Sequence, residues 1–375
     1  MLRCLLAVAI PSLLAIGRLW ADGSEFTPLF NGRDLDGWVN VNCAPETFTV
    51  RDGMIHCDGI PTGALRTARQ YENFELELEW RHLKPGGNAG VFIWAGALPA
   101  VGQPFLRAIE VQVLDHAYGK SDWFTTHGDV FPIHGSTMKP FAPSRGDRSF
   151  PRESRSKGSP EWNHYRIVAT NGVLRLSVNG AEVSGGIDCT WRRGFIALES
   201  EGGVVDWRNL RVRELPSSGA TSDQSAPAAE SWRSLYDGRG LRGWTAPASE
   251  TAVWAADDWT LRSAAKAPST AVLRGVPATG ATELFLDWKW EAKPSGKMPP
   301  LALEFSGSAG RMVLPVLPAA REDGWNRVHL RREGDGFEVR LNGSPAGHVS
   351  APTGDFTPVL VPGEVQTRFA SLFVK

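Results

Sequence analysis

Apolar and polar residues alternate over short stretches of this chain. In "FELELEW" (74–80) every second residue is apolar and the three residues between are glutamates. A period of two predicts a β-strand with one face in a core and the other in water. "VLRLSVNG" (173–180) alternates in the same way and ends in Asn-Gly, a strong signal for a hairpin turn. No segment keeps a helical period.

Many strands of this kind are separated by turns that contain glycine or proline, and "GFIALES" (194–200) and "VDWRNLRVREL" (205–215) add two more. This pattern predicts an all-β fold, built as a sandwich or jelly roll. The 15 tryptophans stand largely where strands should face a core, so we interpret most of them as packing residues.

The chain also repeats itself. "LFNGRDLDGW" (29–38) returns as "LYDGRGLRGW" (235–244), "FELELEW" returns as "LFLDWKW" (284–290), and "EWNHYRIV" with "VLRLSVNG" (161–180) returns as "GWNRVHLR" with "FEVRLNG" (324–343). Residues 216–231 between the copies are small and polar, which is typical of a flexible linker. We therefore predict two β-sandwiches in tandem, at residues 24–215 and 232–375.

The second copy is shorter and degenerate. Trp162 follows Trp80 by 82 residues, whereas Trp325 follows Trp290 by only 35, so the second copy lacks 47 residues. In the first copy this interval holds most of the polar and ionisable residues discussed below. Because the framework strands survive without them, we expect those residues to serve function and the site to belong to the first copy.

The N-terminus has the pattern of a secretory signal at residues 1–21: Arg3, an apolar stretch from Leu5 to Ile16, and a cleavage site after Ala21. That stretch is too short to span a bilayer, and no later run is long enough. The sequence thus predicts an exported protein, periplasmic or extracellular. Without Arg3 and Arg18, 38 basic residues face 41 acidic ones, which gives no general attraction to nucleic acid or membranes.

Cysteine usage agrees with export. Cys43, Cys57 and Cys189 remain after the signal, and an oxidising compartment permits a Cys43–Cys57 disulfide with one buried thiol left over. No cysteine has histidine or cysteine neighbours at the spacing of a zinc site.

The most informative polar strand is "RAIEVQVLDH" (107–116). Its apolar residues share one face, while Glu110 and Gln112 share the other, with Cα atoms about 6.7 Å apart. That spacing suits two contacts to one sugar ring, although an ordinary solvent-facing strand gives the same pattern. Several neighbours of chemical interest favour the functional reading: Asn88, Asp115, His116, His127, Asp129 and His134.

Two residues of "GGNAGVFIW" (86–94) join the candidate site. Glycines around Asn88 allow close backbone approach, so Asn88 is either a sugar contact or part of a turn. Trp94 is either a core residue or a platform for a sugar ring.

"HGDVFPIHG" (127–135) supplies His127, Asp129 and His134. As acid–base groups they are better placed than as metal ligands, because this spacing is common by chance. We predict no metal site and no cofactor, with calcium binding left open. The arginine-rich stretch 144–159 is most simply a solvated loop or a lid.

A conventional glycosidase needs two carboxylates on either side of the glycosidic bond. Laminarinase-type enzymes place their acidic residues at alternate positions along one strand. The strand at 107–116 offers Glu110, then Gln112, then Asp115 at the corresponding positions, so the middle carboxylate is missing. A standard retaining mechanism is therefore disfavoured, while Glu110 with Asp115 or Asp129 stays open.

Taken in order, "LFNGRDLDGW", "GGNAGVFIW", "IEVQVLD", "EWNHYRIV", "LSVNG" and "VDWRNLRVREL" resemble the 3-keto-disaccharide hydrolase domain family over residues 26–215. The resemblance implies a concanavalin/laminin-G-like jelly roll, frequent export, and cleavage of glycosides already oxidised at C3 of one sugar. The second copy resembles the family only at its ends.

This implied chemistry explains the missing carboxylate. A ketone at C3 acidifies the C2 hydrogen, so one base can remove it while the C1 substituent leaves, and water then adds to the enone. We assign the base to Glu110 or His134 and the acid to His127 or Asp129. Contacts to the sugar or its enolate are assigned to Asn88, Trp94, Gln112, Asp115 and Lys139.

The chain departs from the family pattern in two places. An arginine is usual at Trp94, and Gln-Asp-His-Gly is usual where this chain has Glu199-Ser200-Glu201-Gly202. Glu201 would have to replace that histidine, and Glu199 shares its face, so both join the substrate-binding candidates. The sequence favours an enzyme that cleaves a glycoside or oligosaccharide, with a non-catalytic carbohydrate-binding jelly roll as the alternative and a structural surface protein less favoured.

Overall fold

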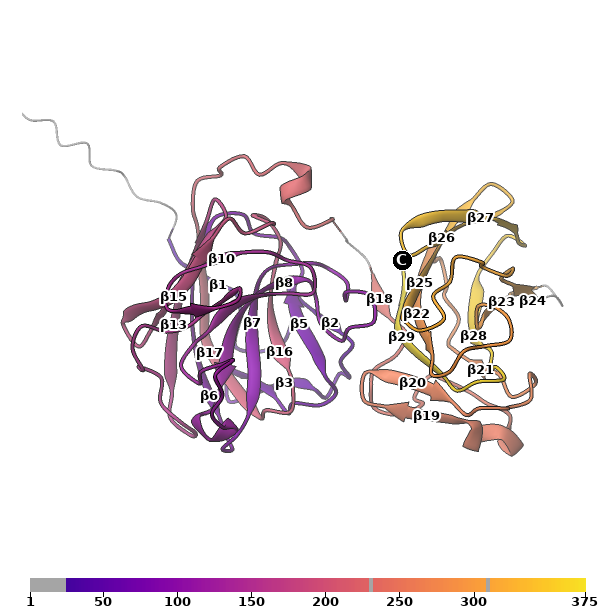
Figure 1. Ribbon diagram of the computed structural model, residues 1–375, viewed down its shortest axis with the longest axis horizontal. Helices are drawn as coiled ribbons and strands as arrows, with labels where there is room; N and C mark the ends of the chain where they lie inside the picture. Colours follow the sequence, from indigo (N-terminus) through magenta and orange to yellow (C-terminus); the bar gives the residue numbers. More distant parts are fainter. Residues whose placement is uncertain (1–24, 229–231, 308–310) are drawn as a thin grey trace, which may run out of the picture.

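The computed structural model describes residues 25–228, 232–307 and 311–375. The predicted signal segment, residues 1–21, lies outside these ranges. Within them the regular secondary structure is almost wholly β-strand, in four sheets with antiparallel strand pairs. Two sheets come from residues 27–214, here called the first half, and two from residues 233–374, the second half. Figure 1 shows the halves side by side, the first in indigo to magenta and the second in orange to yellow.

The first sheet has the strand order β10-β15-β14-β13-β6-β17-β4-β3, with β1 paired to β17. Its strands are β10 (Lys139–Pro140), β15 (Ala181–Ile187), β14 (Val173–Val178), β13 (Asn163–Thr170), β6 (Phe74–His82), β17 (Val205–Glu214), β4 (Met54–Cys57), β3 (Phe48–Arg51) and β1 (Thr27–Pro28).

The second sheet has the order β11-β12-β9-β8-β7-β16-β5-β2 and carries the polar strand of the sequence analysis. Its strands are β11 (Ser144–Arg145), β12 (Arg148–Ser149), β9 (Val130–Ile133), β8 (Ala108–Leu114), β7 (Asn88–Ala95), β16 (Phe195–Ser200), β5 (Gly63–Thr67) and β2 (Trp38–Val41).

The second half has a third sheet of order β19-β20-β29-β22-β25-β26-β27, with β18 paired to β29, and a fourth of order β21-β28-β23-β24. Their strands are β18 (Arg233–Ser234), β19 (Trp254–Asp257), β20 (Thr260–Ser263), β21 (Leu273–Arg274), β22 (Glu283–Trp290), β23 (Leu301–Phe305), β24 (Arg311–Val313), β25 (Asn326–Glu333), β26 (Gly336–Leu341), β27 (Ser344–Ser350), β28 (Phe356–Leu360) and β29 (Thr367–Val374). The short 3₁₀ turns are η1 (His116–Tyr118), η2 (Ser222–Gln224) and η3 (Ala248–Val253).

Alternation along the strands builds the core of the first half. The apolar residues of β6 are buried in one cluster with residues of β7, β8, β13, β16 and β17, and the tryptophans at 80 and 207 are at its centre. The glutamates of β6 point the other way and pair with arginines on the neighbouring strands, as Glu77 does with Arg211 and Glu79 with Arg208. The pattern of residues 74–80 is thus confirmed.

The predicted hairpins are confirmed as well. Asn179 and Gly180 both have positive φ, 47° and 91°, and connect β14 to β15 by a two-residue turn. Asn342 and Gly343 do the same between β26 and β27, with φ of 51° and 85°. Both turns are of the kind whose twist matches that of the paired strands.

Two expectations from the sequence differ from the structure. Residues 216–226 are not a free linker: Glu72 accepts hydrogen bonds from Ser218 and Ala220, and the Ala226 amide bonds to Arg193 O. The three cysteines of the described residues are buried and free, so the Cys43–Cys57 disulfide is not formed.

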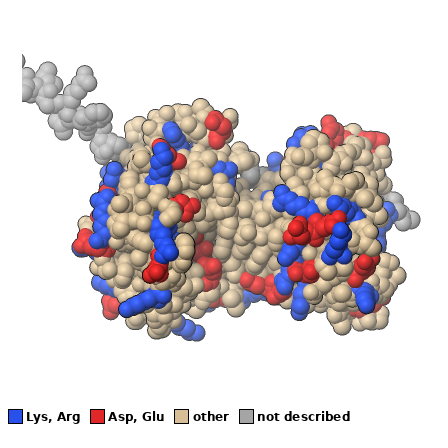
Figure 2. Space-filling model, in the orientation of Figure 1, with Lys and Arg blue, Asp and Glu red and all other residues tan. Residues whose placement is uncertain are grey.

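Two observations describe the charge and hydropathy of the molecule. Figure 2 shows basic and acidic side chains intermingled over the visible face of both halves. Among the described residues, no helix is long and apolar enough to cross a membrane.

Candidate functional site

A cavity of about 370 Å³ opens on the face of the second sheet that is turned away from the core of the first half. We call it the acidic cavity, because three glutamates lie in it. It is lined by Asn88, Gln103, Pro104, Phe105, Glu110, Gln112, Leu114, Tyr118, Phe124, Phe131, Ile133, His134, Arg148, Glu199 and Glu201.

Strand register explains why the polar residues meet there. Gln112 of β8 lies opposite Gly90 of β7, and on the other side of β7 Glu201 bridges to Asn88. Since alternate residues of a strand share a face, Glu110 and Gln112 point into the same cavity as Glu199 and Glu201. The pairing of residues 110 and 112 predicted from sequence therefore holds, but with both side chains buried at the cavity floor and not standing in open water.

Gly90 makes room for two carboxyl groups. A Cβ atom at this position would lie 2.9 Å from Glu199 Oε2 and 3.1 Å from Glu110 Oε1. The two carboxyl groups thus approach the same point of the β7 backbone from neighbouring strands. Any larger residue would push them apart or out of the cavity.

A chain of hydrogen bonds crosses the cavity floor. Asn88 donates through Nδ2 to Glu201 and accepts from Gln112 Nε2 at 2.8 Å. Gln112 Oε1 in turn accepts from Arg148 Nη1 at 3.3 Å, and the same nitrogen lies 3.1 Å from Asp129 Oδ2. The chain fixes the amide orientations and brings one positive charge to the edge of a site that holds three acids.

Burial raises the pKa values of all three glutamates to neutral pH or above. It raises the pKa of Glu110 to about 8, with repulsion from Glu201 adding to the shift and Arg148 opposing it. It raises the pKa of Glu201 to about 7, opposed by the hydrogen bond from Asn88. Burial and the two neighbouring acids raise the pKa of Glu199 well above its usual range, and its Oε2 has no hydrogen-bond partner among the described residues. Carboxylic acids and carboxylates therefore coexist here near neutral pH.

The candidate histidines are not brought together. His134 lines the cavity at the end of β9, where its ring stacks on Phe105 with centroids 6.1 Å apart, and burial lowers its pKa. His127 instead faces His116, with ring centroids 4.8 Å apart, and lines a different pocket. Placing His127 among the catalytic residues was wrong, because the loop after η1 turns it away from β8.

Asp129 and Asp115 are structural. Asp129 is fully buried beneath the cavity, where it accepts from Thr125 and pairs with Arg148, so it orients that arginine and does not face the cavity. Asp115 accepts from the backbone amides of Gly86, Ala117 and Ser159, at 2.8, 2.8 and 2.6 Å. Although burial opposes them, these donors hold the pKa of Asp115 below its usual value. Both assignments to substrate chemistry are corrected.

Trp94 and Lys139 also lie elsewhere. Trp94 is buried in the core, edge-to-face with Phe74, and donates from Nε1 to Glu72 O at 2.7 Å. Lys139 is exposed on β10 of the other sheet and pairs with Asp188 at 2.8 Å. Neither is among the residues that line the acidic cavity.

Sequence reasoning missed Arg148 and the aromatic wall. Arg148 belongs to β12, and its guanidinium carbon lies 3.4 Å from the ring centroid of Phe131. The stretch 144–159 looked like a solvated loop because its charges are dense, and only the pairing of β12 with β9 takes Arg148 to the cavity. No group of three or more His, Cys, Asp and Glu side chains suited to a metal ion is found in the part of the chain that the structure describes.

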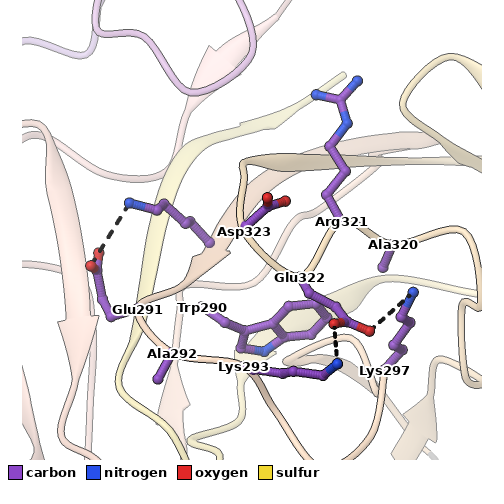
Figure 3. A pocket seen from close by; sticks show the side chains of 10 residues that line it. Trp290, Glu291, Ala292, Lys293, Lys297, Ala320, Arg321, Glu322 and Asp323 are labelled. Carbon is purple, nitrogen blue, oxygen red and sulfur yellow. Dashed lines mark ion pairs between the residues drawn. The ribbon is translucent and has the colours of Figure 1, made fainter.

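A second cavity, of about 610 Å³, lies on the second half (Figure 3). Five of its seven charged side chains pair with one another: Glu322 binds Lys293 at 3.0 Å and Lys297 at 3.5 Å, and Lys289 lies 3.8 Å from Glu291. The pairing lowers the pKa of Glu322, whereas the pKa values of the three glutamates in the acidic cavity are raised. We therefore place the chemistry in the acidic cavity.

Residues 25–213 match the model of the 3-keto-alpha-glucoside-1,2-lyase-like domain, and this range contains every residue that lines the acidic cavity. The chain belongs to the 3-keto-alpha-glucoside-1,2-lyase-like family. A relative from Bacteroides thetaiotaomicron, a 3-keto-disaccharide hydrolase, is 31% identical over 254 residues, covering 53% of this chain and 81% of that protein. The family resemblance of the motifs is thereby confirmed, and the chain is a member of a carbohydrate-active family.

Solved structures similar to this chain include a glycosyl hydrolase, described as putative, from Parabacteroides distasonis ATCC 8503, at 20% identity, 51% coverage of this chain, 94% of that chain and a TM-score of 0.38. Another is the carbohydrate-binding module CBM66 from Bacillus subtilis, at 10% identity, 48% and 96% coverage and a TM-score of 0.34. Identities this low do not indicate a shared activity.

Proposed function

We propose that this chain cleaves the glycosidic bond of a 3-keto-glycoside by elimination and hydration in the acidic cavity. The observation that carries the proposal is the pair Glu201 and Glu110, which share one cavity with pKa values of about 7 and about 8. Near neutral pH such a pair supplies one ionised base and one protonated acid, which is what the elimination needs.

In the first step Glu201 takes the proton from C2, which the neighbouring ketone makes acidic. The electron pair of the C2–H bond forms the enolate, whose negative oxygen at C3 is stabilised by the Arg148 guanidinium. Collapse of the enolate forms the C1–C2 double bond and breaks the bond from C1 to the leaving oxygen. Glu110 gives that oxygen its proton, so the leaving sugar departs as a neutral alcohol.

In the second step water adds across the double bond. Glu110, now ionised, takes a proton from the water as its oxygen attacks C1, and Glu201 returns a proton to C2. Both glutamates end in their starting states, and the products are the alcohol and a 3-keto sugar. No carboxylate has to act as a nucleophile, which agrees with Gln112 standing where a retaining glycosidase would need an acid.

This assignment revises the roles expected from sequence. The sequence assigns the base to Glu110 or His134, but the raised pKa and deep burial of Glu110 suit the acid. Burial raises the pKa of Glu201 only to about 7, because the hydrogen bond that it receives from Asn88 favours its ionised form. Glu201 would thus take the place of the family's usual histidine. We further propose that the chain acts after export, as its N-terminal pattern predicts.

The test is release of monosaccharide from a 3-keto-disaccharide by the purified chain and by variants. Glu201→Gln and Glu110→Gln should each lower kcat by on the order of 10²–10⁴. The matched control is Glu182→Gln, since Glu182 is exposed, pairs with Arg175 at 2.7 Å and does not line the acidic cavity, so the rate of this variant should not change. Binding of the disaccharide without release by the unmodified chain would show a carbohydrate-binding protein and overturn the proposal.

A further inference from the structure

One wall of the acidic cavity comes from the loop between β7 and β8, residues 96–107, which we call the cavity loop. It turns tightly: the Gln103 amide donates to Ala100 O at 3.0 Å, and Gly102 has a φ of 66°. Immediately after the turn, Gln103, Pro104 and Phe105 line the cavity. The position of the turn therefore sets the position of this wall.

The tip of the cavity loop is held by the second half of the chain. Asp287 Oδ2 accepts from the Gly102 amide at 3.0 Å, and Arg327 Nη2 donates to Pro99 O at 2.8 Å. Asp287 of β22 and Arg327 of β25 lie opposite each other and form a two-bond ion pair, at 2.6 and 2.8 Å. Because Asp287 has no exposed surface, its charge depends on this arginine and the loop amide for compensation.

A tryptophan closes the same contact. A Cβ atom at Gly102 would lie 2.2 Å from Trp325 Cγ, so the indole rests directly on the glycine backbone. The ring is backed by Trp259, with ring centroids 5.6 Å apart. We call Asp287, Trp325 and Arg327 the clasp.

Apolar packing continues this contact to the cavity wall. Phe105 belongs to one buried cluster with Phe92 of β7, and that cluster includes Trp232 and Phe373 from the second half. Figure 1 shows β18, which follows Trp232, at the junction between the halves. The wall of the cavity is thus supported by the second half through both polar and apolar contacts.

We propose that the second half is part of the sugar site, in that its clasp positions the cavity loop against bound substrate. Asp287, Trp325 and Arg327 are positioning residues and do not touch the substrate themselves. This gives the shortened copy a role: it lacks the polar interval of the first copy but supplies a rigid sheet on which the loop is held. The proposal rests on the proposed function only for the identity of the ligand.

The first test is hydrogen exchange of the cavity loop in the full chain. Asp287→Ala removes the acceptor of the Gly102 amide and leaves Arg327 without its partner, so exchange in peptides covering 96–107 should rise at least about tenfold. Asp287→Asn keeps an oxygen acceptor for the Gly102 amide, so exchange of the cavity loop in this variant should lie between that of the unmodified chain and that of Asp287→Ala. The matched control is Glu304→Ala, which breaks another ion pair of the second half, to Arg311 at 2.8 Å, on the fourth sheet and not on the sheet that carries the clasp.

The second test is the effect on substrate binding. With a 3-keto-disaccharide as substrate, Asp287→Ala should raise KM about five- to twentyfold and change kcat less than about threefold, since the loop binds the sugar and the reacting groups stay in place. Gly102→Ala should do the same through its clash with Trp325, whereas Gly280→Ala, at a similar φ of 68° with nothing within 4 Å, should not.

The two readouts separate this proposal from the proposed function. If the unmodified chain cleaves no 3-keto-disaccharide but Asp287→Ala frees the loop, the proposed function fails and the clasp stands. Unchanged loop exchange in both Asp287→Ala and Gly102→Ala would overturn the clasp. If the unmodified chain is active, faster exchange of the cavity loop in Asp287→Ala together with an unchanged KM would also overturn the proposal. If Asp287→Ala does not fold, Asp287→Asn and Gly102→Ala decide by the same criteria.

Discussion

The most demanding prediction concerns the pH dependence of cleavage. In the proposed mechanism Glu201 must be ionised, so kcat/KM falls as pH drops below its pKa of about 7. Glu110 must be protonated, so kcat/KM falls as pH rises above its pKa of about 8. Two limbs only about one pH unit apart give a narrow bell with its maximum near pH 7.5. The two values belong to a coupled cluster and are expected as its apparent constants.

The size of the effect follows from the same two values. Beyond each pKa the productive form becomes about tenfold rarer per pH unit, so kcat/KM should fall by more than about tenfold from pH 7.5 to about pH 5.5 and to about pH 9.5. The assay is initial release of monosaccharide from a 3-keto-disaccharide at low substrate, in overlapping buffers from about pH 5 to 10. Blanks without enzyme correct for the alkaline lability of keto sugars. Samples returned to pH 7.5 must regain full activity, so that unfolding is not mistaken for titration.

A profile that is flat from about pH 5 to 9 would refute the reasoning. So would a single limb between about pH 4 and 5, because ordinary solvated carboxylates titrate there. Either result would mean that the buried acids are not the groups whose ionisation limits cleavage.

Three further predictions concern the same cavity. Asn88→Ala removes the donor that favours ionised Glu201, so the acid limb of the profile should move to higher pH while the alkaline limb stays, as the same titration series would show. Gly90→Ala places a methyl group against Glu199 and Glu110, so kcat should fall at least about tenfold with a stability loss of about 1–3 kcal/mol by denaturant unfolding; full activity would show that the glycine is not required. Folding raises the pKa of Glu110, so its protonated form is favoured in the native state and stability is lost as pH rises from about 4.5 toward about 8. Glu110→Gln should therefore raise the free energy of unfolding relative to the unmodified chain more at pH 8 than at pH 5, by at most about 5 kcal/mol, and an equal effect at both pH values would contradict it.

The strands could be predicted because each half-buried strand carries its own period. "FELELEW" shows which residues of β6 face the core without any knowledge of the neighbouring strands. The Asn-Gly turns are equally local, because only residues that adopt positive φ easily fit them. The missing interval in the second copy likewise needed only the sequence.

The site was harder to predict because it depends on which strands are neighbours. Glu110 and Gln112 could be paired from one strand, and Glu199 and Glu201 from another. That β8, β7 and β16 are adjacent, with Gly90 between them, is a property of the sheet order alone. Arg148 reaches the cavity only through such long-range pairing.

The same limit explains the wrong assignments. Asp115 looks chemically free in the sequence, but three backbone amides use its carboxylate to hold the turn after β8. Trp94 ends the run "VFIW" of β7, which is apolar on both faces, so the sequence could not tell a core position from a ligand platform. Its burial against Phe74 decides the matter.

The central claim is that cleavage begins with removal of the C2 proton, and the most direct measurement is the fate of that hydrogen. A substrate deuterated at C2 should react with a primary isotope effect on kcat/KM. In deuterated water the released keto sugar should carry deuterium at C2 to the extent that the proton held on Glu201 exchanges with solvent before it is returned. Mass and NMR spectra of the product, compared with an enzyme-free control, measure both. A product with no deuterium at C2, formed at the same rate from either substrate, would mean direct hydrolysis at C1 and would contradict the account.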